Sequence, residues 1–252
     1  MRFSATLALL AALPVLAAPS HAQTGEPPAS VATERWNFEL VPYLWLANLD
    51  GTIQLGNLPE ADASASFTDL LENLDFAAAT FFSARKGPWV VLSDVSYTAL
   101  AVEDQVAASK VNVDSTLFWT SLAAGYELDA GEHGSLDVFV GARYTLLDND
   151  AKSTGVVNAT STKNVAWIDP IVGFDARNDF SERLSVGLLA DVGGFGVGSE
   201  HTYELLPRVT YAFNRTLALH AGYRWLDTEF DDDGVDYDVT ESGWILGLGI
   251  GF

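Results

Sequence analysis

The sequence predicts an all-β protein: a transmembrane antiparallel up-and-down β-barrel of about ten strands, with a short helix in its first external loop. Three observations support this prediction. An export signal precedes a chain that is 48% hydrophobic but has no second apolar run long enough for a membrane helix. Strand-length segments place large apolar residues on one face. Short connections also alternate with long ones along the chain.

Composition excludes several other classes of protein. The chain has 252 residues, with 34 acidic and 13 basic side chains, no cysteine and a net charge of -21. The hydrophobic content excludes a disordered chain, and the lack of cysteine excludes a disulfide framework and a cysteine metal cluster. Nucleic-acid binding is excluded because it needs Lys and Arg to displace phosphate counterions.

The first 22 residues have the parts of a secretory signal peptide. Arg2 supplies the positive charge, residues 5–18 are apolar, and Ser20-His21-Ala22 is a small-x-small cleavage signal. The apolar run is shorter than the roughly 20 residues that a membrane helix needs. We therefore expect a signal peptide over residues 1–22, a periplasmic N-terminal segment over 23–35 and the transmembrane barrel over 36–252.

The last ten residues show the clearest strand pattern. In residues 243–252 every even position is large and apolar, whereas four glycines and Ile245 occupy the odd positions. Glycines on the inner face of a narrow barrel leave room for long side chains from other strands. Pro207 predicts a local bulge in its strand. The same alternation predicts ten strands, at residues 36–47, 76–85, 89–100, 115–128, 136–147, 165–177, 184–197, 203–213, 217–225 and 243–252.

The connections between these strands form two sets. Membrane barrels of bacteria have short periplasmic turns and longer external loops, so the short set is expected in the periplasm together with both chain ends. A soluble β-sandwich is the rival fold, and gel mobility separates the two because a barrel migrates faster unboiled than boiled. The short set is 86–88, 129–134, 178–183 and 214–216; the other is 48–75, 101–114, 147–164, 198–202 and 226–239.

The secretory signal, the alternating terminal strand and the C-terminal Phe252 resemble those of the outer-membrane β-barrels of Gram-negative bacteria. Residues 66–75 and 190–199, with Gly222-Tyr223-Arg224, are similar to segments of uncharacterised small barrels of proteobacteria. The resemblance implies an outer-membrane location, contact with outer-membrane lipid and lipopolysaccharide, and recognition of Phe252 by the barrel assembly machinery. It implies no activity.

Charged residues within the predicted strands fall on the inner face. An arginine or lysine facing mid-membrane lipid costs about 2–4 kcal/mol, which explains this restriction. We expect a paired network that largely fills the narrow lumen, and a narrow path for ions or small polar solutes is the alternative. The residues are Glu39, Arg85, Asp94, Arg143, Asp169, Asp175, Arg177, Asp191, Glu204, Arg208, His220 and Arg224.

The sequence predicts no catalytic, cofactor-binding or metal-ligating residue, and hence no enzyme. Ser199-Glu200-His201 has the residue types of a catalytic triad, but adjacent strand residues point to opposite faces. His220 could pair with Asp191 or Glu204 on neighbouring strands as a structural contact. The expected role is envelope integrity or surface interaction. A rim enzyme acting on lipid A or peptides is the second alternative.

Two of the external connections have features of their own. Glu229-x-Asp231-x-Asp233 imitates a calcium loop but has Thr240 where a bidentate Glu is required, so divalent cations are only a possible partner of this acidic loop. In residues 66–74, Ser66 is a good N-cap, and apolar residues recur at helical spacing. We expect a short helix there that covers the mouth of the barrel.

Overall fold

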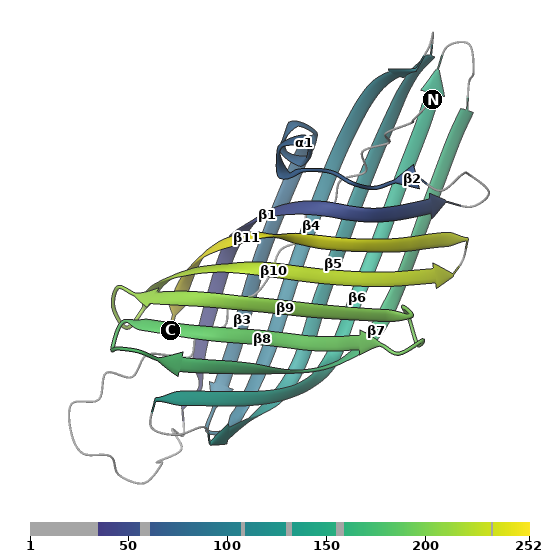
Figure 1. Ribbon diagram of the computed structural model, residues 1–252. Coiled ribbons are helices and arrows are strands. Elements are labelled where there is room, and N and C mark those ends of the chain that lie inside the picture. Colours follow the sequence, from purple (N-terminus) through teal and green to yellow (C-terminus); the bar gives the residue numbers. More distant parts are fainter. Residues whose placement is uncertain (1–34, 56–60, 107–108, 130–132, 155–158, 233) are drawn as a thin grey trace, which may run out of the picture.

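The computed structural model describes residues 35–55, 61–106, 109–129, 133–154, 159–232 and 234–252 (Figure 1). The predicted signal peptide and most of the predicted N-terminal segment lie outside these ranges. Within them, no helix has the length and hydropathy to cross a membrane.

In this part of the chain, ten long antiparallel strands form a closed up-and-down barrel, as the sequence predicts. Each pairs with its neighbour in the chain, and β1 pairs with β11 from Glu39↔Gly251 to Leu55↔Val235 to close the barrel. The strands are β1 (Asn37–Leu55), β3 (Leu74–Lys86), β4 (Trp89–Val106), β5 (Ser109–Asp129), β6 (Gly134–Thr154), β7 (Ala159–Asp179), β8 (Leu184–Gly194), β9 (His201–Ala212), β10 (Leu217–Asp232) and β11 (Val235–Gly251). A two-residue strand, β2 (Ala61–Asp62), and a helix, α1 (Phe67–Glu72), lie between β1 and β3.

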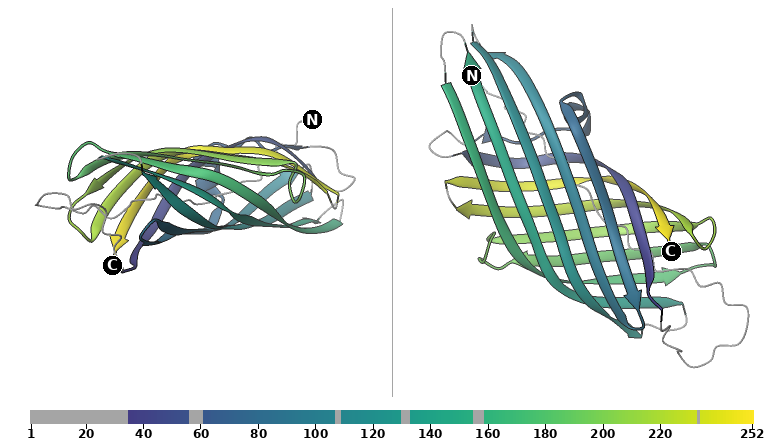
Figure 2. Two further views of the ribbon diagram at one scale, coloured as in Figure 1. Left: turned by 90° about the horizontal axis from the view of Figure 1, so that it is seen from below. Right: turned by 180° about the vertical axis from the view of Figure 1, so that it is seen from behind.

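The two ends of the barrel differ (Figure 2). At the turn end, tight turns join the strands and the start of β1 meets the C-terminal residue, with backbone hydrogen bonds of 3.0 Å in both directions between Phe38 and Phe252. At the hairpin end, strands extend well past the predicted boundaries. Pairing continues to Val106↔Ser109, Ser153↔Ala159 and Asp232↔Val235.

Three long connections predicted as loops, at 101–114, 147–164 and 226–239, are therefore mostly β-hairpin. In 226–239 the prediction was wrong because polar residues occupy the outer face beyond the apolar band, as they do in a solvent-exposed loop. Alternation in fact continues there: Phe230 and Tyr237 are buried on the inner face, whereas Asp231 is exposed. The predicted bulge at Pro207 is also wrong, since the register with β8 and β10 is constant around it.

The two faces of the barrel wall differ as predicted. Trp244, Leu246 and Leu248 point outward and are 63%, 49% and 41% exposed. Arg143 and Asp191 point inward and are almost completely buried. The outward face is thus apolar where the inward face is charged, which is the arrangement that a lipid environment requires.

Inward-facing glycines provide space for large side chains of other strands, as expected. A Cβ atom at Gly249 would collide with the ring of His220 and approach Glu39 Oε1 to 2.8 Å. One at Gly187 would lie 2.8 Å from the guanidinium carbon of Arg208. The bare inner face of β11 is therefore matched to bulky side chains of the adjacent strands β1 and β10.

The predicted helix forms, but it lies in the barrel wall beside β1 instead of across the mouth. Ser66 caps it: its hydroxyl and backbone N–H donate to Asp69, which lowers the pKa of that carboxyl. Backbone bonds between Leu49 and Ala65 hold the preceding segment to β1. The Asn48 side chain accepts a hydrogen bond from the N–H of Phe67 at 3.0 Å. These contacts fix α1 at the level of Asn48.

A charge on the outward face of β11 tests the orientation of the wall. We expect Leu248→Arg to destabilise the protein by about 2–4 kcal/mol, because the arginine would face mid-membrane lipid. The measurement is urea unfolding in phospholipid vesicles. Asp238→Arg, on the same face beyond the apolar band, is the control, with an expected change of less than about 1 kcal/mol. Equal losses in both variants would contradict the assignment of the lipid face.

Candidate functional site in the barrel lumen

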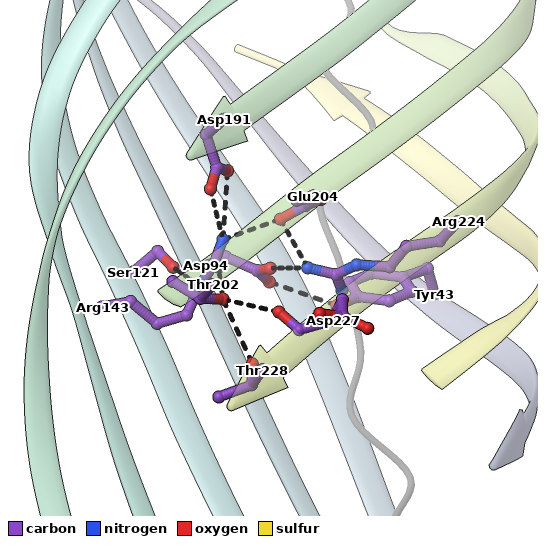
Figure 3. Close-up of polar contacts among 10 residues, drawn as sticks. All are labelled: Tyr43, Asp94, Ser121, Arg143, Asp191, Thr202, Glu204, Arg224, Asp227 and Thr228. Atoms are coloured by element: carbon purple, nitrogen blue, oxygen red, sulfur yellow. Dashed lines mark hydrogen bonds and ion pairs between the residues drawn. The ribbon is translucent and has the colours of Figure 1, made fainter. Parts of the chain in front are cut away.

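The central cluster of the lumen is built around two buried arginines (Figure 3). Arg143, on β6, donates to Asp191 at 3.0 and 3.2 Å and to Glu204 at 2.9 Å. It also donates to the hydroxyls of Ser121 and Thr202, each at 3.1 Å. Five donor–acceptor contacts to side chains of three other strands, β5, β8 and β9, fix this guanidinium in the middle of the barrel.

Arg224, on β10, is the second arginine of the central cluster. It donates to Glu204 at 2.7 Å and lies 3.9 Å from a carboxylate oxygen of Asp94. Its guanidinium carbon is 4.8 Å from the ring centre of Trp45 and 4.7 Å from that of Trp119. Cation–π attraction to both indoles strengthens in a site without solvent, and Arg224 is 0% exposed.

Asp94 and Tyr43 complete the central cluster, which we define as Tyr43, Asp94, Arg143, Asp191, Glu204 and Arg224. The Tyr43 hydroxyl donates to Asp94 at 3.1 Å (Figure 3). Isolated buried charges are strongly unfavourable, but here carboxylates and guanidinium groups are paired across six strands. Each of these strands therefore places in the lumen a side chain whose partners lie on other strands and come within reach only when the barrel is closed.

A separate group of ionic contacts lies nearer the turn end. Arg85 pairs with Glu127 at 2.8 Å and with Asp137. Arg208 donates to Asp175 at 2.6 Å. These pairs fill the lumen between β3, β5, β6, β7 and β9.

His220 is fully buried close to the same end. Its Nδ1 atom lies 3.0 Å from the Thr210 hydroxyl, and its Nε2 atom lies 3.6 Å from Glu39. The predicted pairing of His220 with Asp191 or Glu204 is wrong, because those carboxylates turn toward Arg143 further along the barrel. The alternation along a strand predicts which face of the wall a side chain is on, but not which neighbouring side chain it contacts.

Apolar side chains fill the lumen on both sides of the central cluster. Toward the hairpin end, Trp167 stacks on Phe230 with ring centres 4.2 Å apart, and Tyr237 lies 6.1 Å from Trp167. On the other side, Phe81 and Phe139 line a cavity of about 30 Å³ beside the central cluster. That volume is enough for water but not for a larger solute. Apolar layers thus flank the ionic network in the described part of the lumen.

The structure places every predicted lumen residue on the inner face. Of those outside the clusters, Asp169 accepts from Trp167 Nε1 at 3.0 Å, and Arg177 pairs with Asp179 near the turn end. The sequence analysis missed Glu127, Asp137 and Glu241. The alternation of inward and outward residues along a strand could have found the first two, since both lie inside predicted strands. With these three, acids outnumber arginines among the described lumen residues.

The residues of the triad-like tripeptide point to different surroundings. Ser199 is buried and donates to Asp169 from both its hydroxyl, at 2.8 Å, and its backbone N–H, at 2.6 Å. His201 lies on the outer face, 3.1 Å from carboxylate oxygens of both Asp227 and Glu229. They do not assemble a catalytic triad. Among the described residues, no group of three or more His, Asp or Glu side chains has the geometry to hold a metal ion.

Comparison with known proteins shows the fold. No family model matches the sequence, and no curated protein matches it. The outer membrane protease OmpT from Escherichia coli has a TM-score of 0.50 and 6% identity, covering 89% of this chain and 98% of its own. The translocator domain of autotransporter NalP from Neisseria meningitidis has a TM-score of 0.45 and 12% identity, covering 92% and 90%. Ail, the attachment invasion locus protein of Yersinia pestis, has a TM-score of 0.36 and 13% identity, covering 87% and 100%. The similarity to OmpT shows the fold of an outer-membrane β-barrel and carries no information on the chemistry of this protein.

Glu204 is the acid that joins the two central arginines, so its removal tests the network. We expect Glu204→Gln to destabilise the protein by about 3 kcal/mol, because Arg143 and Arg224 would lose a shared buried counter-ion. The measurement is urea unfolding in vesicles. Glu229→Gln on the exposed outer face is the matched control and should change stability by less than about 1 kcal/mol. If Glu204→Gln left the stability to urea unchanged, the network would not have the importance stated here.

Proposed function

We propose that this protein is a non-conducting, non-enzymatic integral barrel of the outer membrane, acting in envelope integrity or surface interaction. The observation that carries the proposal is the position of Arg224. Its fully buried guanidinium lies between two indole rings and is bonded to Glu204 across the middle of the lumen. A solute crossing the barrel would have to break these contacts and leave the buried charges without their partners.

Insertion in a membrane is supported by the outward face. On β10 it is apolar or aromatic from Leu217 to Trp225, and Asp227 follows. These nine residues match the 9–11 that a tilted strand needs to cross the hydrocarbon. Trp225 and Tyr223 at one boundary and Phe252 at the other fit aromatic girdles. The proposed orientation has the turn end in the periplasm and the hairpin end outside the cell.

The surface available for interaction is the hairpin end. On the outer face of β10 and β11, Glu229 lies opposite Asp238, and Asp231 lies opposite Asp236. Like charges in directly opposed positions repel, and so favour a bridging cation or a cationic partner. We propose that divalent cations link this face to anionic lipopolysaccharide. In the same proposal, the exposed terminal Phe252 is the residue that the assembly machinery binds.

Single-channel recording tests the proposal. Purified protein refolded into planar bilayers should give no conductance steps above leak, because the central cluster blocks the lumen. The doubly truncated variant Trp119→Ala/Arg224→Ala removes two of the side chains that fill the centre and should admit small ions. Faster gel mobility of the unboiled samples would establish that both proteins are folded barrels.

Two outcomes would overturn the proposal. Regular conductance steps from the wild type would support the narrow-channel alternative. Altered lipid A in an intact-lipid mass comparison of a deletion strain with its parent would support the rim enzyme instead.

A further inference from the structure

The barrel wall has an opening between β1 and β3. Pairing between these strands starts at Asn37↔Arg85 and ends at Pro42↔Thr80. Beyond that point β3 stays with β4 as far as Leu74, whereas β1 next pairs with Ala65 and β2. The two strands therefore separate. We call the space bounded by residues 43–48 of β1, residues 75–79 of β3 and helix α1 the wall window.

Both strand edges of the wall window are open. Among the described residues, none pairs with the backbone of positions 43–48 on this side. Leu49 exchanges backbone hydrogen bonds with Ala65 across the same edge. By the two-residue period of a strand, the backbone groups of Tyr43, Trp45 and Ala47 point into the window as those of Leu49 do.

Side-chain exposure shows that the window reaches through the wall. In most of the described strands exposed and buried residues largely alternate, but Asp75, Phe76, Ala77 and Ala78 are four exposed residues in a row. Ala77 lies opposite Thr98, which shares its inner face and is only 1% exposed. Side chains in the lumen thus cover the inner face of β4 at Thr98 but do not cover the inner face of β3 at Ala77.

The window lies at the depth of hydrocarbon. On the outer face of β1, Leu44 is 66% exposed and Leu46 is 39% exposed, and the polar Asn48 marks the end of the apolar band. Phe76 and Ala78 continue this apolar surface on β3. In Figure 1, α1 lies beside β1 and precedes β3. The opening therefore faces the leaflet nearer the hairpin end, just below α1.

We propose that the wall window binds one acyl chain of a lipid from that leaflet. This inference rests on the membrane insertion proposed above. Most of the rim is apolar, with Asn48 and Asp75 at its polar end, and Ala77, Ala78 and Ala79 leave a shallow surface for a thin chain. The ester oxygens of such a lipid would lie near the open N–H groups of Trp45 and Ala47, close to the level of Asn48. A peptide strand fits less well, because it needs a constant spacing of about 4.8 Å from each edge and these edges diverge.

The lack of cysteine in the chain allows a clean labelling experiment. A nitroxide would be attached to Ala77→Cys, and its collisions with molecular oxygen and with a water-soluble nickel chelate measured in phosphatidylcholine vesicles. Ala124→Cys, on the lipid face of β5, and Ala123→Cys, buried in the lumen, are matched controls. We expect the label at position 77 to be accessible to oxygen as at 124, and protected from nickel.

The other outcomes are decisive in different ways. Protection from both reagents, as expected at position 123, would show a sealed wall and overturn the window. Preferential collision with nickel at 77 would show water there and overturn acyl-chain binding. Loss of oxygen contact at the control position 124 would instead contradict membrane insertion, and so the proposed function itself.

Native mass spectrometry provides a second measurement that does not depend on a label. Wild-type protein extracted in mild detergent should retain one lipid, and Ala77→Phe, which fills the window, should retain none. Ala124→Phe is the control and should behave as the wild type. A peptide in place of lipid, or equal lipid retention by all three proteins, would overturn the proposal.

Discussion

The need to satisfy backbone hydrogen bonds without water determines the rest of this structure. In hydrocarbon each unpaired N–H or C=O costs several kcal/mol, so strands can cross only as a closed barrel. Closure between β1 and β11 then divides every strand into two faces. The outward face of β11 carries Trp244 and Leu248, whereas the inward face of β6 carries Arg143. The apolar outward face that contacts lipid and the inward face whose charges need partners are thus consequences of one constraint.

A narrow closed barrel also has to fill its own interior. The glycines of β11 and Gly187 of β8 supply space, and side chains such as Arg208 and His220 occupy it. The central arginines are stabilised by carboxylates and indoles that approach from other strands. The lumen side chains pack around them and leave a cavity of about 30 Å³ beside them, so the interior acts as a core, and the hairpins and the wall are the surfaces proposed for function.

The wall window is a place where pairing between consecutive long strands is interrupted within the apolar band. Pro42 ends the pairing of β1 with β3, and the segment before α1 takes over the β1 edge only from Leu49. The cost of leaving backbone groups open in hydrocarbon is a reason to expect an occupant there. An opening toward lipid beside an occluded lumen gives this barrel a binding surface independent of transport.

The sequence by itself determined the barrel, its ten strands, the capped helix at Ser66 and the inner position of all twelve predicted lumen residues. These are consequences of local alternation and capping, which depend on neighbouring residues in the chain. Tertiary structure alone decided that Glu204 joins Arg143 and Arg224, that His220 meets Thr210, and that Trp45 and Trp119 enclose a guanidinium. The hairpin extensions and the place of α1 were decided there too. The alternation along a strand specifies which face of the barrel wall a side chain is on. Strand tilt and the divergence of β3 from β1 determine which side chains from distant parts of the sequence meet.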